Sequence, residues 1–157
     1  MATGRIVGIF TAPTRGAPMI AHESVEAIAA RGLVGDRYLR ARGSFSGQRI
    51  ADEERAVTLI EREAVEAVRA EHGIALAAAE TRRNLVTTGV ALNDLVGRTF
   101  SVGDIELRGV DLADPCAYLE SLTREGVQRA LVERGGLRAA IVTGGTLHVG
   151  DFIDVGP

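Results

Sequence analysis

Residues 99–110 read TFSVGDIELRGV. Two short apolar runs flank Gly103-Asp104, a dipeptide typical of tight turns between antiparallel strands. We therefore predict strands at 99–102 and 105–110, joined in a hairpin. The chain repeats this design near its end, where LRAAIVTGGTLHVGDFIDV (137–155) predicts strands at 137–143, 146–149 and 152–155, separated by glycine-containing turns.

Most of the remaining chain also favours short strands. Apolar and β-branched runs predict strands at 5–10, 56–60 and 85–88, and partial alternation over 24–30 allows another. A helix is predicted over 61–72, and shorter helices over 115–122 and 125–133. Residues 40–52 show no period and are predicted to form a long surface loop. The sequence thus predicts one domain over residues 1–157, mostly β or α+β, built as a closed or partly closed β-barrel with short helical insertions.

The composition excludes several classes of function. All 18 basic side chains are Arg, so the chain has neither a lysine for covalent pyridoxal phosphate nor a P-loop lysine. Its single cysteine excludes an intramolecular disulfide and multi-cysteine zinc or iron–sulfur sites. A net charge of -3 argues against nucleic acid as a partner. The sequence shows no leader or membrane segment, so we expect a cytoplasmic protein with no membrane partner.

The lone cysteine, Cys116, is the main candidate for chemistry. It follows Asp114, a suitable N-cap, and Pro115, which suits the first position of a helix. This predicts Cys116 at the second helical position, where free backbone N–H groups and the helix dipole favour a reactive sulfur. Such a sulfur could be a metal ligand, a persulfide carrier or an acyl-transfer nucleophile. A buried, unreactive cysteine is the alternative interpretation.

Histidines give this cysteine little support. His22, His72 and His148 have no companions at metal-ligand spacing, so each is interpreted as a structural or surface residue, and a Cys–His hydrolase is unsupported.

Several basic residues have donors that suit an anionic ligand. Asp36-Arg37 closes a glycine turn, either as a turn salt bridge or as an arginine presented to a ligand. Arg83 and Asn84 directly precede a strand, next to a second arginine, and Arg138 begins another strand after Gly135-Gly136. An exposed basic pair is the alternative for the first of these groups.

Five blocks taken together carry more information than any residue alone. They are GLVGDR (32–37), RRNLVTTGVALNDLVGRTFSVGD (82–104), DPC (114–116), RGGLRA (134–139) and GDFI (150–153). In this order, over about residues 5–155, they resemble the MOSC family, whose domains are related to the C-terminal part of molybdenum cofactor sulfurase. Some relatives have His where this chain has Tyr38.

The resemblance implies a MOSC β-barrel, like the barrel domain of pyruvate kinase in general shape, and binding of the molybdenum cofactor (molybdopterin). It implies that Cys116 is the molybdenum ligand and catalytic residue, and a soft thiolate suits such a metal. The cofactor-binding positions that it implies are Asp36, Arg37, Arg83, Asn84 and Arg138. Pyridoxal phosphate is also associated with the family, but a chain without lysine cannot hold it covalently.

Three functions remain open on the sequence. Cys116 could serve a molybdenum-dependent oxidoreductase that reduces N-hydroxylated substrates with an external electron-donor protein. It could carry a persulfide for sulfur transfer, supplied by a cysteine desulfurase as partner. The protein could also store or deliver the cofactor without catalysis. The motifs specify neither the substrate nor the oligomeric state.

Overall fold

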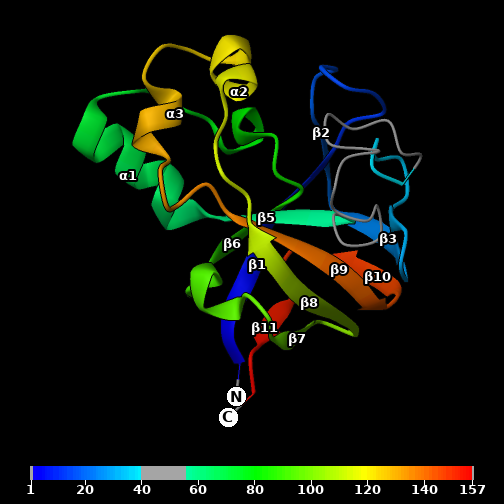
Figure 1. Cartoon of the computed structure of the whole chain (residues 1–157). Coiled ribbons are helices and arrows are strands. Elements are labelled where there is room, and N and C mark those ends of the chain that lie inside the picture. The colour runs from blue at the N-terminus through cyan, green and yellow to red at the C-terminus, as the bar shows by residue number, and fades with distance from the viewer. Residues whose placement is uncertain (1, 40–55, 157) are drawn as a thin grey trace.

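The computed structural model describes residues 2–39 and 56–156. Seven strands close into a barrel, shown in Figure 1, because the last of them pairs back with the first. Around the barrel they are β1 (Ala2–Thr11), β6 (Leu85–Thr88), β5 (Val57–Glu61), β9 (Leu137–Thr143), β8 (Ile105–Leu112), β7 (Thr99–Val102) and β11 (Phe152–Asp154). The predicted mostly-β barrel is thus confirmed, and it is fully closed.

The hairpin predicted from residues 99–110 is present. Val102 lies opposite Ile105, with Gly103 at a positive φ of 56° in the turn between β7 and β8. The strand predicted at 146–149 is also present, as β10 (Gly145–His148), but it leaves the barrel. It pairs with β3 (Ser24–Ile28), which pairs in turn with β4 (Gly32–Leu33), in a separate small sheet. A further short strand, β2 (Ile20–His22), extends the barrel sheet from β1.

Helices cover one side of the barrel, and this explains why residues 57–60 of the strand after residue 56 are buried on both faces. Val57 and Leu59 belong to the barrel core, whereas Ile60 belongs to a second core beneath the helices. The strands β5 and β6 are parallel, and the helix α1 (Arg62–His72) makes the crossover between them. The helices α2 (Ala117–Leu122) and α3 (Val127–Ala130) pack against the same second core through Leu119 and Val127.

The barrel has two distinct ends. At one end β1 begins and β11 finishes, since Ala2 lies opposite Asp154. At the other end β1 and β8 finish, β6 and β9 begin, and α2 lies above the opening (Figure 1). Two 3-10 turns, η2 (Ala78–Thr81) and η3 (Leu92–Leu95), complete the described elements. The surface loop predicted over residues 40–52 falls outside the described residues. No helix in the described ranges has the length and apolarity needed to cross a membrane.

Candidate functional site

A cleft opens at the end of the barrel where β1 and β8 finish. It contains about 330 Å³ of free space, open solvent at its mouth included. The described residues that line it are Arg37, Tyr38, Arg82, Arg83, Cys116, Tyr118 and Leu119. Three arginines and a thiol therefore share one cleft, and no carboxylate is among these lining residues. Guanidinium groups bind anions, and a thiolate binds partners with affinity for sulfur. This set of residues therefore favours a ligand that combines both properties.

Cys116 is partly exposed in this cleft, but it is not where the sequence places it on the helix. It is the residue before the first turn of α2, with extended backbone angles, φ -137° and ψ 168°. The prediction that Asp114 caps the helix and that Cys116 is its second residue is therefore wrong. The helix starts only at Ala117. The segment before Cys116 is held to the barrel end instead, where Arg83 binds the carbonyl groups of Ala113 and Asp114.

Arg83 holds the chain segment that leads to Cys116. Its Nε donates to the carbonyl oxygen of Gly135 at 2.7 Å, and its Nη2 donates to that of Ala113, also at 2.7 Å. A longer bond of 3.4 Å reaches the carbonyl of Asp114. Burial lowers the pKa of Arg83 to about 10, so the guanidinium stays protonated at neutral pH and keeps these bonds. Two donor groups of Arg83 are thus committed to the backbone of the site.

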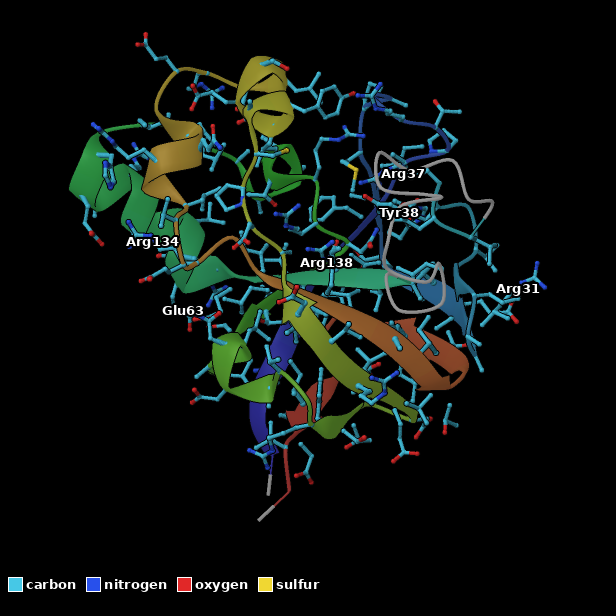
Figure 2. The ribbon with its side chains drawn as sticks, viewed as in Figure 1. Arg31, Arg37, Tyr38, Glu63, Arg134 and Arg138 are labelled. Carbon is cyan, nitrogen blue, oxygen red and sulfur yellow. The ribbon has the colours of Figure 1, made fainter. Side chains whose placement is uncertain are left out.

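Arg37, which lines another wall of the cleft, forms a buried ion pair with Asp36. Arg37 Nη1 lies 3.2 Å from Asp36 Oδ1, and both side chains are almost fully buried. Asp36 also accepts from the backbone N–H of Ala12, which fixes the turn to the end of β1. The guanidinium of Arg37 lies over the ring of Tyr38, 4.5 Å from its centroid. Figure 2 shows Arg37 and Tyr38 together at this end of the barrel, while Arg31 extends away from it.

The cleft is also lined by Arg82, the second arginine of the predicted basic pair, and by Tyr118, which the sequence did not indicate. Arg82 Nη1 donates to the carbonyl of Ala17 at 2.7 Å, and its Nη2 is buried without a hydrogen-bond partner among the residues described. The ring of Tyr118 stacks beneath the guanidinium of Arg15 at 4.3 Å. Their positions in the sequence are the signal that could have identified both, since Arg82 adjoins Arg83 and Tyr118 lies two residues after Cys116.

Asn84 and Arg138, two other predicted positions, do not line the cleft. Asn84 is fully buried, and its side chain accepts from Thr58 N at 3.0 Å and donates to Phe10 O at 3.0 Å. Its amide therefore joins β1, β5 and the start of β6. Arg138, labelled in Figure 2, donates to the carbonyl of Leu112 at 3.2 Å, in the segment that leads to Cys116.

The histidines lie elsewhere. His22 bonds to Thr11 Oγ1 at 2.7 Å, His148 lies 3.8 Å from Asp151, and His72 is in the last turn of α1. None of them lines the cysteine cleft. Within residues 2–39 and 56–156, no group of three or more His, Cys, Asp or Glu side chains could hold a metal ion by itself.

Comparison with known families gives a decisive match. The model of the MOSC domain matches residues 42–154, most of the chain and every strand from β5 to β11. The chain belongs to the MOSC domain family. This family is associated with the molybdenum cofactor. A comparison with curated proteins gives no significant match.

Solved structures share the MOSC fold seen here. The YuaD protein from Bacillus subtilis superposes with a TM-score of 0.77 at 16% identity, over 98% of this chain and 96% of that one. YiiM from Geobacillus stearothermophilus gives 0.72 at 14% identity, covering 98% and 75% of the two chains. YiiM from Escherichia coli gives 0.66 at 17% identity, covering 98% and 70%. At these identities, the likeness concerns the fold.

Proposed function

We propose that this MOSC protein binds the molybdenum cofactor in the cysteine cleft, with Cys116 as the protein's ligand to molybdenum. The observation that carries the proposal is the meeting of a partly exposed thiol with Arg37, Arg82 and Arg83 in one cleft whose described lining has no carboxylate. A thiolate is a soft ligand, and guanidinium groups suit the phosphate of the pterin. Cys116 offers one protein ligand, so the cofactor itself would supply the remaining ligands.

The arginines that line the cleft have different roles in this proposal. Arg82 adds positive charge to the cleft, with its Nη1 bound to the carbonyl of Ala17. Arg37 is ion-paired with Asp36, which fixes its guanidinium in the wall of the cleft. Arg83 is a positioning residue, because it fixes the backbone before Cys116. When bound, the cofactor would supply a redox-active metal centre for atom transfer.

Metal analysis tests this proposal directly. The protein is expressed in a host with intact molybdenum cofactor synthesis, and molybdenum per chain is measured in the wild type, in Cys116→Ala and in Arg31→Gln. We expect molybdenum in the wild type and in Arg31→Gln, whose exposed side chain lies away from the cleft. We expect its loss in Cys116→Ala. Equal molybdenum in all three proteins would refute the role given to Cys116.

Sulfur carriage is the second candidate, and one observation favours it. Cys116 is accessible and is the only cysteine, so the chain has no second thiol that could displace a bound sulfur as an intramolecular disulfide. The Cys116 thiolate would attack the terminal sulfur of a cysteine desulfurase persulfide. The new S–S bond forms on Cys116 while the donor's S–S bond breaks, and the donor leaves as a thiolate without net oxidation. A reducing cytoplasm would maintain the thiol for this step.

Mass spectrometry distinguishes this role. After incubation with a cysteine desulfurase and cysteine, the wild type should gain the mass of one sulfur atom, removable by a thiol reductant, and Cys116→Ala should gain none. An unmodified wild-type chain excludes sulfur carriage.

Catalysis and cofactor storage are separated by a turnover assay. If molybdenum-loaded protein with an external electron donor reduces an N-hydroxylated compound, the oxidoreductase is supported. If it only transfers the cofactor to an acceptor protein, carriage is supported.

A further inference from the structure

A second hollow lies beside the cysteine cleft, and Arg82 lines both. It is formed by the loop between β1 and β2, by η2 and by the end of α2, and it has about 610 Å³ of free space, open solvent included. We call it the Met19 groove. Its walls include Pro18, Met19, Ala79 and Leu122.

Among its described lining residues, the groove combines apolar walls with one cationic side chain, Arg82. Leu122 is 41% exposed, a large apolar surface to leave in water. Arg82 brings its charge to the floor, with Nη1 bound to Ala17 and Nη2 unpartnered within the described residues. The pKa of Arg82 is lowered, first by burial and then by the charge of Arg37. A buried guanidinium with an unpartnered N–H group is stabilised most by an anionic hydrogen-bond acceptor.

The acidic residue of the groove does not meet this need. Glu80 also lines the groove, but its carboxylate accepts from Arg124 Nη2 at 2.8 Å and from the backbone N–H of Ala77 at 2.9 Å. These bonds direct the carboxylate to Arg124 and lower its pKa. Among its described residues, the groove therefore offers one unpartnered donor on a cation, with apolar side chains around it and a Met19 sulfur that accepts from Arg37 Nη1 at 3.8 Å.

We propose that the Met19 groove binds a small aromatic carboxylate, with its ring against Met19 and Leu122 and its carboxylate on Arg82. A flat ring suits both the aliphatic walls and the sulfur of Met19. Because Arg82 borders both hollows, such a compound would lie next to the Cys116 cleft. The inference rests on the proposed function in that it identifies the class of compound on which the Cys116 centre would act.

The sequence provides a direct probe of this groove. The chain has two methionines, Met1 and Met19, so labelling with [methyl-13C]methionine gives at most two signals, of which one reports on the groove. Benzoate is titrated into the full-length protein, with benzylamine as a cation of similar shape. We expect a saturable shift of the Met19 signal with benzoate and at least tenfold weaker binding of benzylamine. Equal binding of the two compounds, or no saturable shift with benzoate, overturns the proposal.

Two variants locate the carboxylate. Arg82→Gln should weaken benzoate binding at least tenfold, whereas Arg31→Gln, a change of the same kind at an exposed arginine, should leave it unchanged. Leu122→Glu should also weaken benzoate binding, since the substitution places a negative charge on the wall of the groove. Leu122 is exposed to solvent, so a charged side chain can be accommodated there. If benzoate binds both groove variants as it binds the wild type, the proposal is wrong, and the melting temperature of each variant verifies that it is folded.

A third variant separates this inference from the proposed function. Cys116→Ala should retain benzoate binding, because Cys116 lines the other hollow. Loss of binding in Cys116→Ala places the compound in the cysteine cleft and overturns the inference. Absence of molybdenum or persulfide, with an intact benzoate titration, refutes the function at Cys116 and leaves the groove in place.

Discussion

Arg83 Nη2 donates to the carbonyl oxygen of Ala113 at 2.7 Å, three residues before the only cysteine of the chain. The same guanidinium reaches Gly135 in the turn before β9. One side chain, placed just before β6, therefore joins the ends of two other strands beneath the site. Arg83 belongs to the block 82–104, one of those that carry the family resemblance, and its first role is to hold backbone carbonyl groups.

Removing this arginine should loosen the site. In Arg83→Met the apolar stem remains, but the carbonyls of Ala113 and Gly135 lose their donor. We expect the free energy of unfolding to fall by about 1–3 kcal/mol, measured by urea denaturation. The rate at which iodoacetamide alkylates Cys116 should also change. Arg31→Met, at an exposed position, should alter neither quantity.

Gly135 should accept no larger residue. A Cβ atom added there would lie 2.5 Å from the carbonyl oxygen of Ala113 and 2.8 Å from Cδ of Pro115. Gly135→Ala should therefore push the segment before Cys116 away from β9 and cost about 1–3 kcal/mol. Gly150→Ala serves as a steric control, since a Cβ atom there meets nothing within 4 Å, although its φ of +99° carries a strain of its own. A Gly135→Ala protein with wild-type stability and molybdenum content would contradict the close approach.

The Asp36–Arg37 pair should matter more to stability than an exposed pair. Asp36→Ala leaves the buried charge of Arg37 without its carboxylate, so we expect a loss of about 3–5 kcal/mol in thermal or urea unfolding. Glu66→Ala removes the exposed partner of Arg62 and should cost at most about 0.5 kcal/mol. Similar losses in the two variants would show that Asp36 is not needed to compensate Arg37.

Asn84 should be essential to the barrel itself. Asn84→Ala removes the acceptor of Thr58 N and the donor to Phe10 O, in the fully buried layer between β1 and β5. Each group left unsatisfied should cost about 1–3 kcal/mol. We expect a large drop in melting temperature. A loss of cofactor in such a destabilised variant would follow from the damaged fold. A stable Asn84→Ala protein that loses only molybdenum would instead support direct contact with the cofactor.

Glu61 gives a pH-dependent prediction. Desolvation by burial raises its pKa, as do the charges of Glu63 and Asp94, while the bond from Leu92 N opposes them. The folded state therefore holds this proton more tightly than the unfolded chain, and stability falls as pH rises from 4.5 through the raised pKa. Glu61→Gln stays neutral and still accepts from Leu92. It should be more stable than the wild type at pH 7 and equal to it at pH 4, in thermal melts at the two values. A constant difference across this range would contradict the shift.

The closed barrel was largely predictable because its strands are marked locally. Gly103-Asp104 sets a two-residue turn through its own backbone preferences, and the neighbouring alternation gives the register. The place of β10 was not predictable, because its pairing with β3 joins residues more than one hundred positions apart. Similarly, nothing local indicates that Cys116 lies outside the helix. In the structure, the segment that leads to Cys116 is held by Arg83, which lies far from it in the sequence.

The sequence by itself determined the seven barrel strands, the single thiol, the absence of lysine and the resemblance that the MOSC match confirms. Only the tertiary structure decided how the arginines are used. Backbone carbonyl groups at the barrel end are bound by Arg83, by Arg138 and by the amide of Asn84. Arg82, in contrast, keeps a donor that the described residues do not use. The physical reason is that each guanidinium can bind either a carbonyl or an anion with the same N–H groups. Which one it binds depends on the distances between strands, and these distances exist only once the barrel closes.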